Sequence, residues 1–501
     1  MRLLSLRLAC SIAVFFACLN AAWGEAGAAI SSATLGFSVR DAILRALENN
    51  RSLAVERYGP EIMKTFVAEE QSVFDPALAS NLSAAESKGQ RTSGVGAFTG
   101  VSSRQRNASI NVAKRTPLGV NLDLSASATE RSSNVYTKLF STRLGASLTL
   151  PLLRGLGSNA NLAGVRLAES DVDISQYELI GFVLALAAQV EKNYWDLLAA
   201  REELKIRLAS LDLAWQQLAE TKDRIEVGQT AEIELAAAEG ETALREEAVI
   251  DARSLLQTTA LQFLSSLNLS LGQFSSVDIA LLDAPSQEET PLASETEDIA
   301  QALENRPDIG QARVQRKKQK LEIVRTRNGL LPQLDFFITL GQTGYAASFD
   351  QSILNLDQEN YDITGGMIFQ YDLGNRAAKA RNRRVQFREK EAQAAIANFE
   401  QLIELDVRLA HIEVERSTQQ IVATHAATRL QQGKYQAEME KFRVGKSTNL
   451  LVLVAQRDLI QSQLDEMRSQ IAKRLANMKL EQAKGTLLDR HMIVMPTDPT
   501  P

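Results

Sequence analysis

The sequence contains very little cysteine and histidine. Its 501 residues include two cysteines, Cys10 and Cys18, and three histidines, at positions 411, 425 and 491. Residues 25–501 therefore offer no disulfide, thiolate metal site or cysteine nucleophile. We also find no nucleophile elbow, no phosphate-binding glycine loop and no ligand-spaced histidine pair. The sequence thus predicts no catalytic residues, no cofactor and no metal, and it argues against an enzyme.

Long apolar runs are scarce too. Arg2 and Arg7 precede an apolar run at residues 8–19, which small residues follow up to Gly24. This order is typical of a secretory signal peptide, so we expect cleavage near Gly24. Beyond it no stretch approaches the ~18 to 20 apolar residues of a transmembrane helix, so a membrane-spanning part would be a β-barrel. The segment ending in Cys18 matches a lipoprotein processing site poorly, and acylation of Cys18 remains an alternative.

Charge and proline are both distributed informatively. The 61 acidic and 55 basic residues give a mildly acidic balance, which argues against a nucleic-acid partner. Proline is absent between Pro151 and Pro285 and between Pro332 and Pro496, where helix-forming residues prevail. These tracts predict long helices. Their apolar residues recur in steps of 3, 4 and 7, as in coiled-coil seams, with a globular core as the alternative.

The two helical tracts are copies of each other. Shifts of 217 residues (444 − 227) and 256 residues (332 − 76) superimpose landmarks that are many helical turns apart. The matched landmarks are Val227-Gly228 with Val444-Gly445, Leu156-Gly157 with Leu373-Gly374, and Pro76 with Pro332. An internal duplication explains this spacing.

The duplication divides the chain into five segments. We expect a signal peptide at 1–24, a first repeat at 25–272, a linker at 273–293, a second repeat at 294–490 and a flexible tail at 491–501. Each repeat should hold a helix, a strand segment, a long helix and a further helix. The strand segments are expected at 76–151 and 332–372, and the first long helix from Ser158 to Glu226.

The strand segments alternate apolar and mostly polar residues with period two, as the lipid-facing and lumen-facing positions of a barrel do. The first repeat has four candidate strands, which makes one hairpin more than the second repeat has. They lie at 76–86, 106–115, 119–129 and 141–151, with long connections at 87–104 and 130–140 and a tight turn at 116–118.

Three short elements stand out along the duplicated chain. They are Asn305-Arg306-Pro307-Asp308-Ile309, the junction at residues 150–157, and the paired Val-Gly turns. In this order and spacing they resemble the TolC family of bacterial outer-membrane efflux proteins, over residues 36–490. The resemblance implies an α+β fold with an internal two-fold repeat. In that fold long antiparallel coiled-coil helices form a periplasmic α-barrel and the strands form a transmembrane β-barrel, both completed by trimerisation.

The same resemblance implies a function and partners. The chain would be the outer-membrane channel component of a tripartite efflux or type I secretion system, extending into the periplasm and conducting substrates passively. Its partners would be further copies of itself in a homotrimer, a periplasmic adaptor (membrane fusion) protein, an inner-membrane pump and outer-membrane lipid. A periplasmic coiled-coil adaptor without its own membrane barrel is the alternative. The trimer's barrel would have 18 strands (3 × 6), or 12 if the extra hairpin lies outside it.

The turns at Gly228 and Gly445 are expected at the periplasmic mouth, where the family constricts its tunnel. Glu232, Glu234 and Glu239 follow the first turn, and the resemblance places Glu234 where an acid lines the entrance. The alternative is that acids in a first turn merely complement a helix N-terminus.

The second turn departs from the family pattern, because no acid follows it before Asp458. A hydrophobic constriction around Leu451 and Val454 is therefore an alternative to an acidic ring. A basic cluster begins the second long helix, and it is either a solvated face or a site for anionic substrates or lipid head groups. Its members are Arg376, Lys379, Arg381, Arg383, Arg384 and Arg388.

Overall fold

The computed structural model describes residues 35–93, 97–134, 138–229, 231–269, 279–284, 293–357 and 359–493. The predicted signal peptide with Cys18, most of the predicted linker and the end of the predicted tail lie outside these residues. Among the described helices, none combines the length and the apolar character that crossing a bilayer requires. The chain divides into two compact units.

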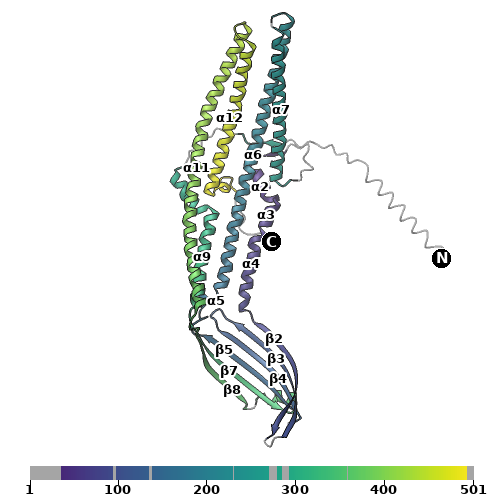
Figure 1. Cartoon of the computed structure of the whole chain (residues 1–501), viewed down its shortest axis with the longest axis vertical. Helices are drawn as coiled ribbons and strands as arrows, with labels where there is room; N and C mark the ends of the chain where they lie inside the picture. Colours follow the sequence, from purple (N-terminus) through teal and green to yellow (C-terminus); the bar gives the residue numbers. More distant parts are fainter. Residues whose placement is uncertain are drawn as a thin grey trace, which may run out of the picture. The chain divides into compact units, whose positions relative to one another are not determined.

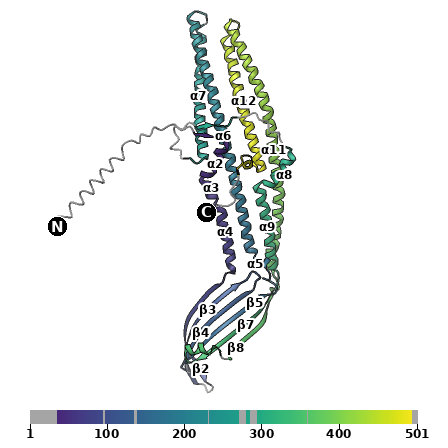
Figure 2. The ribbon, with the colours of Figure 1, turned by 180° about the vertical axis from the view of Figure 1, so that it is seen from behind.

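The first unit consists of Met1–Asn50, Gln189–Glu289 and Ser417–Leu475. It contains β1 (Leu35–Phe37), α2 (Val39–Asn49), α7 (Ile233–Ser266) and β6 (Ile279–Leu281), and β1 pairs with β6 in parallel. It also contains parts of three longer helices, α6 (Ala163–Glu226), α11 (Arg376–Arg443) and α12 (Asn449–Lys484), which appear in Figures 1 and 2.

Tyr194 of α6 holds the small β1–β6 sheet of this unit. Its side chain is fully buried and packs edge-to-face against Phe263 of α7, which packs in the same way against Phe37. The Tyr194 hydroxyl donates to the Phe37 carbonyl at 3.1 Å and accepts from the Asp283 N–H at 3.0 Å. Burial raises the pKa of Tyr194 to about 12, so the hydroxyl stays protonated and can donate.

The second unit consists of Arg51–Ala188, Thr290–Arg416 and Ala476–Pro501. Its helices are α3 (Arg51–Glu56), α4 (Tyr58–Gln71), α5 (Ser158–Asn161), α8 (Glu295–Asn305), α9 (Pro307–Asn328), α10 (Phe349–Leu354), α13 (Leu487–Arg490) and the remaining parts of α6, α11 and α12. A core cluster that includes Ile309, Ile403 and Val407, all fully buried, joins α8, α9, α11 and the end of α12.

Six antiparallel strands form one sheet in the second unit, in the order β2-β3-β4-β5-β7-β8. The strands are β2 (Ala77–Ser93), β3 (Ala97–Arg115), β4 (Asn121–Ser133), β5 (Leu139–Pro151), β7 (Gln333–Ala346) and β8 (Tyr361–Gln370). Each strand pairs with the next in the order, so one edge of β2 and one edge of β8 lack a partner within the described chain.

The register sorts the side chains of this sheet into two faces. Directly paired residues share a face, so Val112, Leu124, Ala146, Leu340 and Ile363 form one continuous row. We call the face with this row the apolar face. The opposite face carries mostly Asn, Ser, Thr and Asp. The predicted alternation is therefore confirmed in the part of the sheet next to the helices, whereas toward the far ends of β2, β3 and β4 the apolar face also carries the charged residues Glu86, Arg104, Arg106 and Glu130.

The predicted extra hairpin of the first repeat is confirmed, since β2 to β5 all lie there. The predicted long connections at 87–104 and 130–140 are wrong, because the strands extend through most of both segments. β2 reaches Ser93 and β3 starts at Ala97, with Ser87 paired to Ser103. Small polar residues that we assigned to loops therefore continue the ladder, because its backbone hydrogen bonds do not depend on side-chain type.

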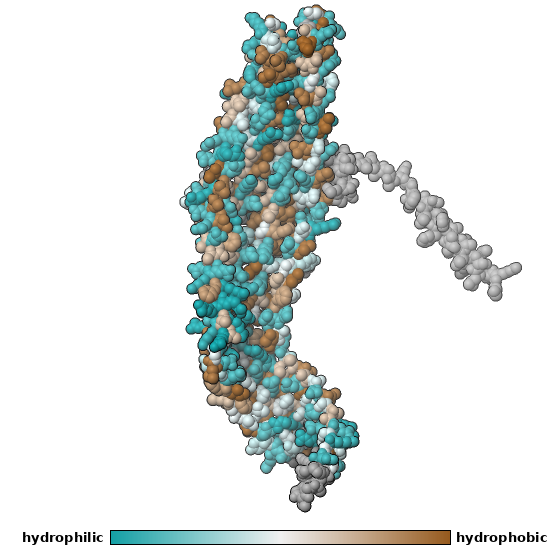
Figure 3. All heavy atoms as spheres, in the orientation of Figure 1, coloured by the Kyte–Doolittle hydropathy of each residue, from teal (hydrophilic) through white to brown (hydrophobic). Residues whose placement is uncertain are grey.

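The helices follow the predicted repeat with local differences. The long helix expected from Ser158 is interrupted at Leu162, so α5 and α6 are separate elements. The single helix expected at the start of the first repeat is three helices, α2, α3 and α4. Both repeats nevertheless contain the expected strand segment, long helix and following helix. Figure 3 shows hydrophilic residues gathered where α9 and α11 approach the sheet.

Candidate functional site

The two helical hairpins turn in the same way. Gly228 after α6 and Gly445 after α11 both have a φ of 72°, which disfavours residues with a Cβ. In each turn the N–H of the residue after the glycine donates to the carbonyl oxygen five residues earlier. Gln229 donates to Arg224 at 2.8 Å, and Lys446 donates to Lys441 at 2.7 Å. This is the Schellman arrangement that ends many helices at glycine. The predicted turn motifs thus have one shared geometry.

Apolar side chains are exposed at both turns. Val227 and Val444 precede the two glycines and are 67% and 66% exposed, and Ile233 and Leu450 just beyond them are similarly open. Isolated exposed residues of this kind are common, but four together at two equivalent turns are suited to contact with other chains.

The three acids predicted near the first turn do not form a cluster. Glu232 caps α7 without a side-chain hydrogen bond to the helix and is exposed. Glu234 is half-buried in the first turn, whereas Glu239 is exposed, with its carboxylate 4.0 Å from the Lys222 Nζ. Groups of acids and histidines able to hold a metal ion are absent among the described residues.

The candidate apolar residues after the second turn point away from their own chain. Leu451 and Val454 are 51% and 40% exposed, whereas the neighbouring Val452 and Leu453 are buried. The two candidates are therefore free to contact other chains or a lumen.

A buried polar network lies within the helices of the first unit and was not predicted from the sequence. Arg245 of α7 is 6% exposed and donates to the Glu241 carboxylate at 3.1 Å, to the Ser210 carbonyl at 3.2 Å and to Gln456 Oε1 at 3.3 Å. Arg457 of α12 binds the other side of Glu241. We call these five residues the Arg245 network. It joins α6, α7 and α12 through the buried guanidinium of Arg245 and the buried carboxylate of Glu241.

The electrostatics of the Arg245 network favour the ion pair. Burial alone would raise the pKa of Glu241, but the hydrogen bonds and charges of Arg457 and Arg245 outweigh it and hold that pKa below its ordinary value. Glu241 is therefore ionised at neutral pH. Burial lowers the pKa of Arg245. Even with this lowered pKa, the guanidinium of Arg245 stays charged at neutral pH.

One sequence signal could have revealed this network. The buried residues of α7 recur at Ala238, Glu241, Arg245, Val249 and Ala252, in steps of 3 or 4. A glutamate and an arginine thus occupy the stripe that apolar residues normally fill. A second buried contact ties the same helices, since Gln217 of α6 donates to Asn449 Oδ1 at the start of α12 at 2.9 Å.

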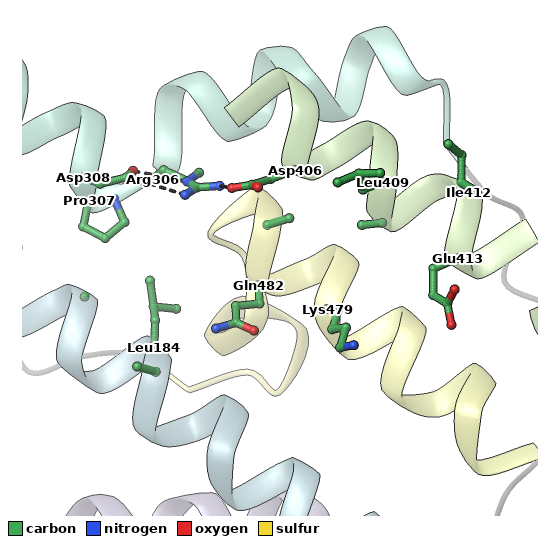
Figure 4. Close-up of a pocket in the computed structure, with 14 residues that line it drawn as sticks. Leu184, Arg306, Pro307, Asp308, Asp406, Leu409, Ile412, Glu413, Lys479 and Gln482 are labelled. Atoms are coloured by element: carbon green, nitrogen blue, oxygen red, sulfur yellow. Dashed lines mark hydrogen bonds and ion pairs between the residues drawn. The ribbon is translucent and has the colours of Figure 1, made fainter. Parts of the chain in front are cut away.

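The Asn-Arg-Pro-Asp-Ile element has a structural role in the second unit. Arg306 donates to Asp308 at 2.7 Å and 3.2 Å and to Asp406 of α11 at 2.9 Å, as the dashed lines in Figure 4 show. Pro307 begins α9 and Ile309 is fully buried. The element therefore joins α8 to α9 and fastens both to α11.

A pocket of about 680 Å³ lies beside this element. Figure 4 shows Leu184 of α6 and Gln482 of α12 directed into it, with Lys479 and Glu413 further along. Its walls are mixed in character. The charged groups that bound it, apart from Lys479, already have ion-pair partners, since Glu413 binds Arg416.

The polar face of the sheet carries one ion pair across three strands. Arg143 of β5 binds Asp362 of β8 at 2.5 Å and 2.7 Å, passing over Gly341 of β7. A Cβ at Gly341 would lie 2.2 Å from the guanidinium, so only glycine leaves room for this bridge.

Comparisons with known proteins agree on the family and the fold. The profile described as Outer membrane efflux protein matches residues 97–269 and 299–486. The pyoverdine export outer membrane protein OpmQ of Pseudomonas putida is 26% identical over 378 residues, which cover 73% of each chain.

Solved structures of outer-membrane channels have the same fold. OprN matches with a TM-score of 0.67 at 16% identity over 89% of each chain. CmeC of Campylobacter jejuni matches with a TM-score of 0.63 at 15% identity, over 90% of this chain and 86% of the other. The predicted α+β fold class is thereby confirmed, and the adaptor alternative, which has no membrane strands, is not supported. The chain belongs to the outer membrane efflux protein family, and it is an outer-membrane channel component of a tripartite efflux system that extends into the periplasm.

Proposed function

We propose that this chain forms a homotrimeric, passive exit duct whose periplasmic mouth is closed by the turns at Gly228 and Gly445. The main support is the pair of open sheet edges. β2 has 17 residues and β8 has 10, and neither has a second partner in the described chain. Long open edges invite pairing with another strand. Pairing β2 of one copy with β8 of the next would close an 18-stranded barrel (3 × 6).

Native mass spectrometry of the detergent-purified protein tests the assembly. A trimer is expected, and a monomer that remains in the soluble periplasmic fraction would overturn the proposal. The same spectrum tests the signal peptide, because removal of residues 1–24 and acylation of Cys18 give different masses for the mature chain.

The gate is proposed to be apolar rather than acidic. Leu451 and Val454 of α12 are exposed, whereas Glu232, Glu234 and Glu239 at the start of α7 do not form a cluster. In the trimer, three copies of this apolar surface would meet at the mouth and exclude water and ions. The acids would then serve mainly the helix N-terminus and the surface.

Single-channel recording in planar bilayers tests the gate. Leu451→Ser combined with Val454→Ser should raise the conductance, because serine removes the apolar contact between copies. Glu232→Gln combined with Glu234→Gln is the matched control and should leave the conductance of the closed state nearly unchanged. The reverse result would favour an acidic ring.

The partners of the duct are an inner-membrane pump and a periplasmic adaptor, and no enzymatic step is required of the chain itself. The exposed apolar residues at both turns are the surface that we assign to the adaptor. Crosslinking in cells from a photoreactive residue at position 227 or 444 should capture an adaptor. Capture from position 340 on the sheet but not from the turns would contradict this assignment.

A further inference from the structure

Five basic residues surround the junction between the helices and the sheet in the second unit. Lys320 and Arg327 lie near the end of α9, and Arg376, Lys379 and Arg383 lie at the start of α11. We call them the basic collar. All five side chains are exposed, and none forms an ion pair with a carboxylate in the described part of the chain. Lys379 reaches only the Gly374 carbonyl, and Arg383 only the Phe387 ring.

The absence of acids here is a property of the local sequence. From Arg376 to Arg388 there are six basic residues and no acidic one. The first acid beyond them, Glu389, is already bound by Arg316 of α9 at 3.0 Å. At the other end of the sheet several cations have acidic partners, as in Arg104 with Glu86 and Arg106 with Glu130. The start of α11 thus carries a run of basic side chains without acidic residues between them.

The residues of the collar lie on one side of the helical layer. α9 contacts α11 through Thr326, at 3.2 Å from Asn382, and contacts α6 through Gln311, at 2.9 Å from Glu178. At 100° per residue, Gln311 and Thr326 are about 60° apart around α9, whereas Lys320 and Arg327 point about 100° or more away from both, to the exposed side of the helix.

α11 runs antiparallel to α9, and its Asn382 and Glu389 mark the flank toward α9. The right-handed turn of both helices then places Arg376, Lys379 and Arg383 on the same side as the α9 residues. Arg381, Arg384 and Arg388 fall on the opposite side of α11.

The apolar face of the sheet is on the same side as the collar. The Thr116 N–H donates to the Val120 carbonyl, so even-numbered residues of β3 direct their N–H groups toward β4. In a view with the helices above the sheet and β4 to the right of β3, the chirality of L-residues directs the side chains of Ile110 and Val112 toward the viewer. The collar residues of α9 and α11 point to the same side in this view. Figure 2 shows how β7 and β8 continue directly into α9 and α11.

Exposed apolar residues lie at and just beyond the end of β8, before the first residue of the collar. Phe369, Tyr371 and Leu373 are 66%, 45% and 92% exposed, and Arg376 follows three residues later. Aromatic residues followed by cations are the usual pattern at a membrane interface, where the ring lies at head-group depth and the charge reaches the phosphates. At ~1.5 Å per residue, all five collar residues lie within about 12 Å of the helix ends. That distance is comparable with the head-group layer plus one Debye length.

We propose that the basic collar binds the anionic phospholipid head groups of the periplasmic leaflet of the outer membrane. This interaction goes beyond conduction, because it fixes the depth of the channel in the bilayer and recruits anionic lipid around the barrel. Basic clusters next to a membrane-spanning segment bind anionic lipid by charge attraction, with a gain of roughly fivefold in affinity per side chain.

Quenching of tryptophan fluorescence by brominated lipids tests the proposal, with the tryptophan placed between the apolar face and the collar. Leu373→Trp places the probe at the most exposed of the residues that lie between the apolar face and the collar. The tryptophans of α6, Trp195 and Trp215, lie in the first unit and give a constant background. The purified trimer is transferred to mixed micelles that contain dibrominated phosphatidylglycerol or dibrominated phosphatidylcholine. The ratio of the two quenching constants measures the preference for anionic lipid.

Two triple variants with the same charge change separate the collar from general electrostatics. Arg376→Gln with Lys379→Gln and Arg383→Gln should strongly reduce the preference for phosphatidylglycerol, and Lys320 and Arg327 account for the preference that remains. Arg381→Gln with Arg384→Gln and Arg388→Gln, on the opposite side of the same helix, should keep the full preference. Salt at 0.5 M should weaken it in the parent protein, because exposed charges are screened.

Equal quenching by both lipids in the parent protein would overturn the proposal. Equal losses in the two triple variants would also overturn it, since the effect would then belong to net charge or to an anionic substrate in the lumen. Assembly is read from the same samples on a native gel. A loss of the trimer, which concerns the proposed function, is thereby distinguished from a loss of lipid preference.

Discussion

Replacing Arg245 with methionine should loosen the helical hairpins and open the channel. The change removes the donors to Glu241, Ser210 and Gln456, all of which are buried. Methionine keeps most of the side-chain volume, so the effect is mainly electrostatic. Removing one partner of a buried ion pair costs about 3–5 kcal/mol, because the other charge is left without compensation.

The expected magnitude is at the lower end of that range. Arg457 remains on the other side of Glu241 and still neutralises its carboxylate. We therefore expect a loss of about 3 kcal/mol per chain in the local stability of α7. Where reclosing is faster than the chemical exchange step, this loss accelerates amide hydrogen exchange on the order of 100-fold.

Hydrogen-exchange mass spectrometry of the trimer measures this change for peptides from α7 and α12. Arg443→Met is the matched control, because Arg443 and Glu440 are both more than half exposed and their pair at 2.8 Å is solvated. Such a surface pair contributes about 0–1 kcal/mol. Unchanged exchange in Arg245→Met, or the same acceleration in the control, would refute the reasoning. Single-channel recording should also show more open events in Arg245→Met alone.

Three further predictions follow from the turns, the sheet and Glu241. Gly445→Ala should destabilise its turn by about 1–2 kcal/mol because its φ is 72°, measured by exchange of the α12 amides. A thiol introduced at Leu118, in the turn between β3 and β4, should be shielded from impermeant reagents on intact cells. The lowered pKa of Glu241 contributes stability above its ordinary value of 4.5. That contribution is lost as pH falls through the lowered value, so acid should reduce the protection factors of the α7 amides less in Glu241→Gln than in the parent protein.

The periodic parts of this fold could be predicted from sequence. Alternation with period two located the strands, because each residue's side is fixed by its place in the pleat. The duplication located the second repeat, since matched landmarks need no knowledge of contacts. Strand ends were less predictable: Ser87 and Ser103 pair within the ladder although their segment is rich in glycine and serine. Ladder length depends on the partner strand, which composition alone does not reveal.

The Arg245 network was harder to predict because its members are far apart in the chain. Ser210 is 35 residues from Arg245, and Gln456 is 211 residues from it. On a long helix rich in charge, a glutamate and an arginine four residues apart usually form a solvated pair. Only their position on the buried stripe of α7 distinguishes them. The predicted gate acids, by contrast, were chosen for their distance from the turn and remain a prediction.

The duplication itself indicates which hairpin is held more firmly. A shift of 217 residues places Glu241 on Asp458 and Arg245 on Ser462. Asp458 is half-buried and bound by Lys434 at 2.6 Å. A serine at position 462 carries no guanidinium, so the second repeat has no equivalent of the buried ion pair. The same network binds α12 through Gln456 and Arg457, and α12 is therefore anchored to the first hairpin. Removing Arg245 therefore affects the two hairpins differently. α12 loses the contact of Gln456 with α7 but keeps those of Arg457 with Glu241 and of Asn449 with Gln217, while the pair of Asp458 with Lys434 is unaffected.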